Sequence, residues 1–162
     1  MKRLKYLMIH CTATPEGREV SSDELRRWHT GPVNKGGRGW RQVGYTDMIH
    51  TDGSVERLVW NNGDDWVDSC EITNGAVGYN GVTRHIVYVG GLAADCRTPR
   101  DTRTAAQLAA MEKYVREFVA RHPQVKVIGH NQVAAKACPS FSVPDWLKLL
   151  KLEDYGTVQV DG

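Results

Sequence analysis

One short segment contains a histidine, a lysine and a cysteine within a span of nine residues: Gly129-His130-Asn131-Gln132-Val133-Ala134-Ala135-Lys136-Ala137-Cys138-Pro139. Imidazole and thiolate are both good zinc ligands, and a catalytic zinc site uses three protein ligands and a water. His10 is the natural third ligand because it ends a short apolar run, and a strand end holds a ligand in a fixed position. A lone histidine is also commonly a hydrogen-bonded polar residue, and a lone cysteine a small buried apolar one. Spacing alone therefore leaves both interpretations open.

The strands that would position these residues are short. Apolar and β-branched runs predict strands over residues 6–11, 84–89 and 125–128, of which the first ends at His10 and the last leads to His130. Asp52-Gly53 between the runs 43–50 and 55–60 predicts a hairpin turn. The run 84–89 is followed by Gly90-Gly91 and is expected to be an inner strand.

Three helices are expected between and after these strands. Ser21 with Glu24, and Thr104 with Gln107, form possible capping boxes, and a last helix starts near Pro144. The glycine-rich residues 30–41 predict a mobile basic loop, and residues 61–81 a further loop. The mixture predicts an α/β fold, a single domain with a mixed central β-sheet flanked by helices, over residues 1–152. Residues 153–162 are expected to be a polar, frayed C-terminal tail.

Composition limits the classes of partner. The 162 residues carry a formal net charge of +2, which neither demands nor excludes a polyanion, and we expect no nucleic-acid partner. The apolar run 6–9 is shorter than a signal peptide needs, and no stretch is long enough to span a membrane. We therefore expect a monomer that is cytoplasmic as synthesised, has no membrane partner and keeps its four cysteines reduced.

Three segments form a distinctive set: Ile9-His10-Cys11-Thr12-Ala13-Thr14, Val43-Gly44-Tyr45 and the closing Val133-Ala134-Ala135-Lys136-Ala137-Cys138-Pro139-Ser140-Phe141. Together they resemble the zinc-dependent N-acetylmuramoyl-L-alanine amidase family, which includes phage lysozymes of the amidase type and, more distantly, peptidoglycan recognition proteins. The resemblance implies a zinc amidase domain over residues 1–152. Carried over by position, it implies His10, His130 and Cys138 as zinc ligands, and Tyr45 and Lys136 as catalytic residues. The implied substrate is peptidoglycan or a muropeptide, cut between N-acetylmuramic acid and L-alanine.

The implied roles make chemical sense. An unactivated amide needs a strong nucleophile and a stabilised oxyanion, and zinc supplies both. If residues 136–138 are extended, Lys136 and Cys138 point to the same face, and the Lys136 ammonium can stabilise an oxyanion. The Tyr45 phenol can orient water or donate to the oxyanion. The residue types leave the general base open, and a solvated Lys136 and an ordinary strand Tyr45 are the plainer alternatives.

The chain also departs from the family pattern. Thr46 and Gly75 stand where the phage enzymes carry histidine, and Arg84 and His85 replace small or aliphatic residues at the start of the inner strand. We expect His85 to be structural, His29 to make a supporting contact and His50 to be exposed. The acidic residues Asp64, Asp65, Asp68 and Glu71 could pair as in a glycosidase, but a solvated loop is the preferred interpretation.

Three other functions stay open at this stage. One is a peptidoglycan-binding protein without catalysis, which Cys138, Tyr45 and Lys136 disfavour because members that only bind typically lack the cysteine. Another is a regulator that binds a protein partner and would keep that binding after metal loss. The third is a zinc peptidase that cuts within the stem peptide. A hydrolase of this kind would act on the cell wall after release from the cytoplasm.

Overall fold

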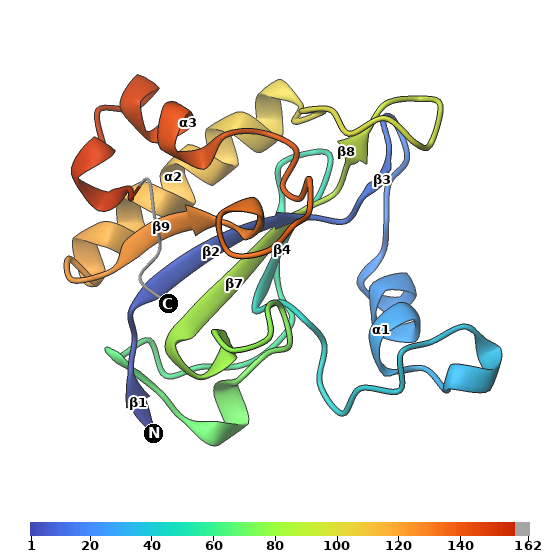
Figure 1. Ribbon diagram of the computed structural model, residues 1–162, viewed down its shortest axis with the longest axis horizontal. Coiled ribbons are helices and arrows are strands. Elements are labelled where there is room, and N and C mark those ends of the chain that lie inside the picture. The colour runs from blue at the N-terminus through green and yellow to red at the C-terminus, as the bar shows by residue number, and fades with distance from the viewer. Residues whose placement is uncertain (158–162) are drawn as a thin grey trace.

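The protein is built around a mixed five-stranded sheet, seen in a computed structural model that describes residues 1–157 (Figure 1). The strand order is β5-β4-β7-β2-β9, in which β4, β7, β2 and β9 run parallel and β5 is antiparallel to β4. These strands span Tyr6–Cys11 (β2), Asp47–Ile49 (β4), Val55–Arg57 (β5), Thr83–Tyr88 (β7) and Lys126–Gly129 (β9). The expected α/β fold with a mixed central sheet is confirmed, and β7 is the inner strand that the sequence predicts.

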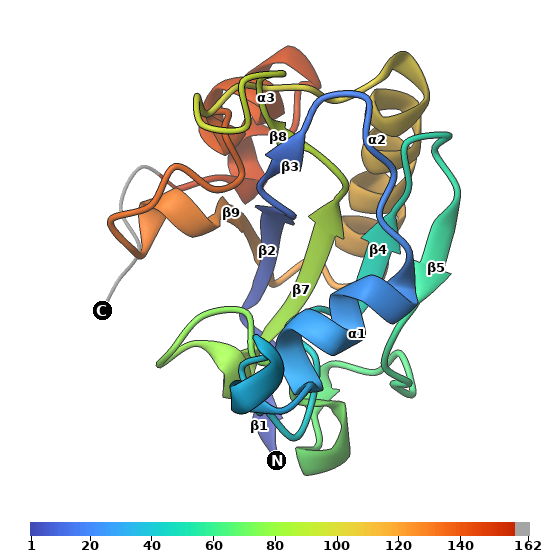
Figure 2. The same cartoon turned by 90° about the vertical axis from the view of Figure 1, so that its right-hand side faces the viewer.

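Helices cover both faces of this sheet. Helix α1 (Ser22–Thr30) lies on one face, and α2 (Ala105–Arg121) and α3 (Val143–Leu149) lie on the other (Figure 2). Because side chains alternate along a strand, Ile9 of β2 packs toward α2 and α3, whereas His10 points to the α1 face. The α1 face is therefore the one on which the sheet carries its chemistry.

The remaining elements are short. Two two-stranded sheets pair β1 with β6 and β3 with β8, and single 3₁₀ turns occur in the loops. Their bounds are Lys2–Arg3 (β1), Thr14–Pro15 (β3), Trp66–Val67 (β6), Gly91–Leu92 (β8), Val33–Lys35 (η1), Ser69–Glu71 (η2), Asn80–Val82 (η3), His130–Gln132 (η4) and Glu153–Tyr155 (η5).

Both predicted capping boxes are present. Ser21 accepts from the backbone N–H of Glu24, and Thr104 accepts from that of Gln107, with each N3 side chain bonding back to its cap. Helix α2 ends at Arg121, two residues before Pro123, because proline cannot continue the hydrogen-bond pattern. Local sequence therefore sets these helix ends correctly.

The hairpin is shorter than predicted. Residues 43–46, 50 and 58–60 are not part of its strands. The N–H groups of Leu58 and Val59 both donate to the carbonyl of Thr46, which ends the regular ladder. The backbone of Gly44 donates instead to His29 Nδ1 at 3.0 Å. The predicted turn at Asp52-Gly53 is present, with Gly53 at a φ of +85° that favours glycine.

Two expectations about polar residues are wrong. Glu71 is not solvated: it is 2% exposed, and its carboxylate pairs with Arg84 Nη2 at 3.1 Å. His50 is not freely exposed but lies between two carboxylates, with ring nitrogens 3.0 Å from Glu19 and 2.8 Å from Glu56. In both cases a partner distant in sequence supplies the compensating charge.

The basic loop and the first residues of the predicted tail are both attached to the domain. Backbone N–H groups of Arg38 and Trp40 donate to the carbonyls of Trp28 and His29, which ties the loop to the end of α1. Residues 153–155 form η5 rather than a frayed end, and Tyr155 packs against the core that α2 and α3 share with the sheet. The rest of the predicted tail, from residue 158, lies outside the described residues.

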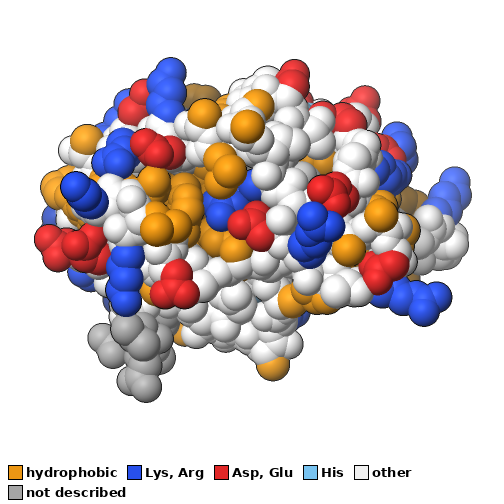
Figure 3. Space-filling model, turned by 90° about the horizontal axis from the view of Figure 1, so that it is seen from above, with side chains coloured by type: hydrophobic (Ala, Val, Ile, Leu, Met, Phe, Trp, Pro, Cys, Tyr) orange, Lys and Arg blue, Asp and Glu red, His pale blue; other side chains and the backbone are white. Residues whose placement is uncertain are grey.

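The surface mixes charges of both signs. Seen from above, lysine, arginine and acidic side chains surround a group of hydrophobic ones, and neither sign dominates that face (Figure 3). Within residues 1–157, none of the helices has the length and apolar character needed to cross a membrane.

Candidate active site

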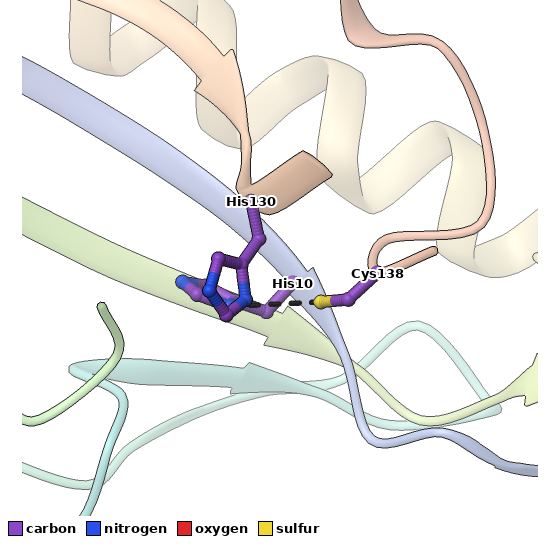
Figure 4. A group of neighbouring side chains, drawn as sticks. All are labelled: His10, His130 and Cys138. Carbon is purple, nitrogen blue, oxygen red and sulfur yellow. Dashed lines mark hydrogen bonds between the residues drawn. The ribbon is translucent and has the colours of Figure 1, made fainter. Parts of the chain in front are cut away.

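His10, His130 and Cys138 lie close together at the carboxyl ends of strands β2 and β9 (Figure 4). His10 lies near the carboxyl end of β2, and His130 directly follows β9, the parallel neighbour of β2. Cys138 comes from the loop between η4 and α3. Their potential ligand atoms all lie within 4.8 Å of one another, so the structure brings together the three residues that the sequence predicts.

Hydrogen bonds from the sheet hold the Cys138 loop in place. The backbone N–H of Cys11 donates to Cys138 Sγ at 3.3 Å. The hydroxyl of Tyr88, which is buried on β7, donates to the carbonyl of Pro139 at 2.6 Å, and Ser140 Oγ donates to the carbonyl of Gly91 at 2.8 Å. The thiol is thus fixed relative to β2 and β7 before any ligand arrives.

His10 is buried and held at both ring nitrogens. Its Nδ1 lies 3.7 Å from Cys138 Sγ, and its Nε2 lies 2.8 Å from His85 Nδ1. The ring also meets those of His130 and Tyr45, with centroids 4.7 and 5.0 Å away. His10 therefore offers Nδ1 to the cluster while Nε2 is engaged on the other side.

Burial keeps the imidazoles neutral. Burial, then neighbouring His85, His130 and Lys136, lowers the pKa of His10, and burial followed by Lys136 lowers the pKa of His130. A neutral imidazole retains the lone pair that a metal ligand needs. The hydrogen bond with Cys11 and burial raise the pKa of the Cys138 thiol, so a metal bound here displaces a proton.

An open groove of about 330 Å³ is lined by two of the three residues, His130 and Cys138. Tyr45 and Lys136 both line it, together with Trp28, His29 and Trp40. The segment that holds Lys136 is a series of turns and not the extended chain that the sequence argument assumed. Lys136 nevertheless lines the groove from this segment of turns.

Tyr45 and His29 are both buried enough to have fixed protonation. Burial and the neighbouring Cys138 raise the pKa of the Tyr45 phenol, so it remains a hydrogen-bond donor. Burial, then Arg38, lowers the pKa of His29 to about 4. His29 Nδ1 accepts from Gly44, which leaves Nε2 as the donor, and the ring packs against Tyr45 with centroids 5.3 Å apart. His29 thus makes the supporting contact that the sequence predicts.

Two residues that support the site, His85 and Tyr88, were not among the predicted site residues. His85 is completely buried and contacts His10 directly, and Tyr88 holds the loop of Cys138. The signal for His85 was available in the alternation of β7, because His85 and Val87 share the face that His10 occupies on β2. The signal for Tyr88 was not, since its partner is 51 positions away.

The donor set fits a zinc ion. One thiol and two neutral imidazoles converge, and the second nitrogen of His10 is already hydrogen-bonded, as is usual for a metal-ligating histidine. The groove leaves one side of the cluster open, which a catalytic site needs and a closed structural site lacks. These residues suit zinc better than Mg²⁺ or Ca²⁺, which prefer oxygen ligands.

A mixed α/β sheet that brings two histidines and a cysteine together beside an open groove is the arrangement expected of a hydrolase. The chain belongs to the N-acetylmuramoyl-L-alanine amidase family, whose model matches residues 1–141. It is 31% identical over 140 residues to an endolysin of Enterobacteria phage K11, covering 86% of this chain and 83% of the relative. This membership confirms the activity predicted from sequence, hydrolysis of the amide between N-acetylmuramic acid and L-alanine in peptidoglycan.

Two solved structures share the fold. The endolysin of the Thermus scotoductus MAT2119 bacteriophage Ph2119 superposes with a TM-score of 0.67 at 23% identity, over 94% of this chain and 86% of that one. Drosophila PGRP-LB superposes with a TM-score of 0.68 at 21% identity, over 100% of this chain and 88% of that one. The fold is therefore common to phage endolysins and peptidoglycan recognition proteins.

Proposed function

We propose that this amidase is zinc-dependent and that His10, His130 and Cys138 hold the metal. The observation that carries the proposal is the convergence of their three ligand atoms within 4.8 Å, beside the groove that His130 and Cys138 line. Zinc bound there would polarise the scissile carbonyl and activate water at neutral pH. The side chains around the cluster then have to orient the substrate and stabilise charge.

Tyr45 and Lys136 are the proposed catalytic residues. The Tyr45 phenol stays protonated, because its pKa is raised by burial, and it can donate a hydrogen bond to the oxygen on which charge develops. Lys136 is exposed at the rim, and its positive charge already lowers the pKa of His10 and His130. The same charge would favour an oxyanion in the groove.

The groove walls suit a muropeptide. Trp28 and Trp40 provide aromatic surface for apolar faces of the substrate. Of the three basic residues in the loop 30–41, Lys35, Arg38 and Arg41, only Arg38 lines this groove; its guanidinium lies 4.9 Å from the centroid of the Trp40 ring. We therefore propose Arg38, rather than Lys35 or Arg41, as the residue that contacts a substrate carboxylate.

The site of action follows from the substrate. The endolysin name of the phage relatives supports a role in opening the wall from within an infected cell. We propose that the enzyme is made in the cytoplasm and acts on the wall after release.

The test combines metal content with product analysis. Wild type, Cys138→Ser and the matched control Cys70→Ser are purified, bound zinc is quantified, and each digests purified peptidoglycan. Cys70 is a free, exposed cysteine and controls for loss of a thiol. Wild type and Cys70→Ser should hold about one zinc and free L-alanine amino termini detectable by mass spectrometry, whereas Cys138→Ser should do neither.

Two results would contradict the proposal. If Cys138→Ser keeps zinc and full activity, the ligand assignment is wrong. If zinc-loaded wild type binds the wall but frees no peptide, the catalytic roles of Tyr45 and Lys136 fail, and a recognition function becomes the better account.

A further inference from the structure

His85 lies directly beside His10 on the neighbouring strand. The parallel register pairs Met8 with His85 and His10 with Val87, so the two histidines share the α1 face of the sheet. His10 Nε2 and His85 Nδ1 are 2.8 Å apart, and both rings are at most 1% exposed. One of these two nitrogens must carry the hydrogen of this bond.

Asn80 determines which one does. His85 Nε2 lies 2.9 Å from Asn80 Oδ1, and the same oxygen accepts the backbone N–H of Ala76 at 2.9 Å. Because an amide oxygen only accepts, His85 Nε2 must donate, and a neutral His85 then has a bare Nδ1. That Nδ1 must accept from His10 Nε2–H. The chain of bonds leaves His10 Nδ1 without a hydrogen and facing Cys138 Sγ, 3.7 Å away.

Gly75 provides the space that the His85 ring occupies. A Cβ added at Gly75 would lie 2.4 Å from His85 Nδ1 and 2.5 Å from its Cγ, closer than non-bonded atoms approach. Gly75 has no positive φ that would require glycine for its backbone. The absence of a side chain there is therefore explained by the ring of His85 and not by chain conformation.

We propose that His85 is a positioning residue for the metal centre. His85 holds His10 in the Nε2–H tautomer and directs His10 Nδ1 toward the space between Cys138 and His130. Asn80 anchors His85, and Gly75 leaves it room. The inference rests on the proposed function, because it assigns His10 Nδ1 as the ligand atom. It also connects two of the residues that depart from the family pattern, Gly75 and His85, in one arrangement.

The first test needs no variant. Histidine-labelled wild-type protein, metal-free and zinc-loaded, is studied by long-range ¹H–¹⁵N NMR, which distinguishes protonated from bare ring nitrogens. We expect Nε2–H and bare Nδ1 on His85 in both states, and Nε2–H on His10. Protonation of His85 at Nδ1 would overturn the proposal.

The second test measures zinc affinity by competition with a chelator. His85→Phe keeps the ring volume but cannot accept from His10, and the dissociation constant should rise about 10- to 100-fold, the usual cost of removing an outer-shell partner. His85→Gln can accept from His10 and donate to Asn80, so it should restore most of the affinity. Gly75→Ala should weaken binding as His85→Phe does. Gly81→Ala is the matched control, because its Cβ meets nothing closer than Lys2 Cδ at 3.9 Å.

The outcomes separate the two proposals. Unchanged zinc affinity in a folded His85→Phe, with wild type binding zinc normally, overturns the role of His85 and leaves the zinc amidase intact. If wild type takes up no zinc, the proposed metal dependence fails, and the tautomers of the metal-free protein still decide whether His85 orients His10.

Discussion

Neutralising Glu71 should destabilise the protein far more than neutralising a surface glutamate. Glu71 and Arg84 are both 2% exposed, and the carboxylate is enclosed by donors. Oε1 accepts from Arg84 Nη2 and the N–H of Asp68, each at 3.1 Å, and Oε2 accepts from the N–H of Asn62 at 3.0 Å. In Glu71→Gln the guanidinium loses its counter-charge, and an amide nitrogen faces at least one N–H donor.

The magnitude follows from leaving a buried charge unpaired. Breaking such a pair by removing one partner costs about 3–5 kcal/mol. For a domain of this size, 1 kcal/mol corresponds to roughly 2–4 °C in melting temperature, so we expect a fall of about 6–20 °C. The matched control is Glu112→Gln on α2, whose carboxylate pairs with Arg116 at 3.1 Å while both are more than 40% exposed. That change should cost less than about 1 kcal/mol.

The assay is urea unfolding followed by tryptophan fluorescence, with chelator present so that metal loss does not contribute. Wild type, Glu71→Gln, Glu112→Gln and Arg84→Met are compared, and the double variant Glu71→Gln/Arg84→Met completes a cycle. The coupling between Glu71 and Arg84 should be favourable and should exceed 1.4 kcal/mol, a tenfold change in the unfolding equilibrium. If Glu71→Gln costs no more than Glu112→Gln, the reasoning from burial is refuted.

Three further predictions concern the site and the surface. Tyr45→Phe should lower kcat/KM about 10²- to 10³-fold with zinc content unchanged, measured on a soluble muropeptide; an equal loss of zinc would instead make Tyr45 a structural residue. Burial lowers the pKa of His50, but bonds to Glu19 and Glu56 outweigh it and raise that pKa above its ordinary value of 6.5. The stability that His50 contributes is therefore present below pH 6.5 and lost as the pH rises through the raised value; His50→Gln should cost about 0.5–1 kcal/mol at pH 6 and little at pH 8.5, and a cost independent of pH would contradict this sign. Chelation should abolish activity, and free zinc at a hundredfold excess over its dissociation constant should stabilise the fold by about 2.7 kcal/mol, visible as a higher melting temperature that Mg²⁺ does not reproduce.

Features that depend on local pattern could be predicted from the sequence. The capping boxes at Ser21 and Thr104 and the turn at Gly53 each need only a few neighbouring residues, and the structure has them where expected. The closeness of His10 to His130 could also be predicted, because each lies at the carboxyl end of a strand and the two strands, β2 and β9, are parallel neighbours.

Contacts that depend on register between distant segments could not be predicted. No local pattern near Glu71 indicates that Arg84 is its partner. The acidic stretch that contains Glu71 is therefore predicted to be a solvated loop. Similarly, Val43-Gly44-Tyr45 has the alternation of a strand, but the N–H of Gly44 donates to His29 Nδ1 and the carbonyl of Val43 accepts from the N–H of Asn74. The segment therefore leaves the sheet, and Tyr45 lines the groove. In each case a tertiary partner replaced the one that secondary structure would have provided.

The position of β2 in the sheet also determines when, during synthesis of the chain, the site can form. β2 is the first strand of the five-stranded sheet to be made, yet it pairs on one side with β9, and His10 meets a thiol 128 positions later in the chain. During synthesis from the N-terminus, the emerging chain carries an unpaired edge of β2 until residues 126–129 leave the ribosome. The cluster of His10, His130 and Cys138 cannot close before nearly the whole domain has been translated. If the cluster holds the catalytic metal as proposed, a chain that ends before Cys138 would be unable to cut the wall, and lytic capacity would appear only once the chain extends past that residue.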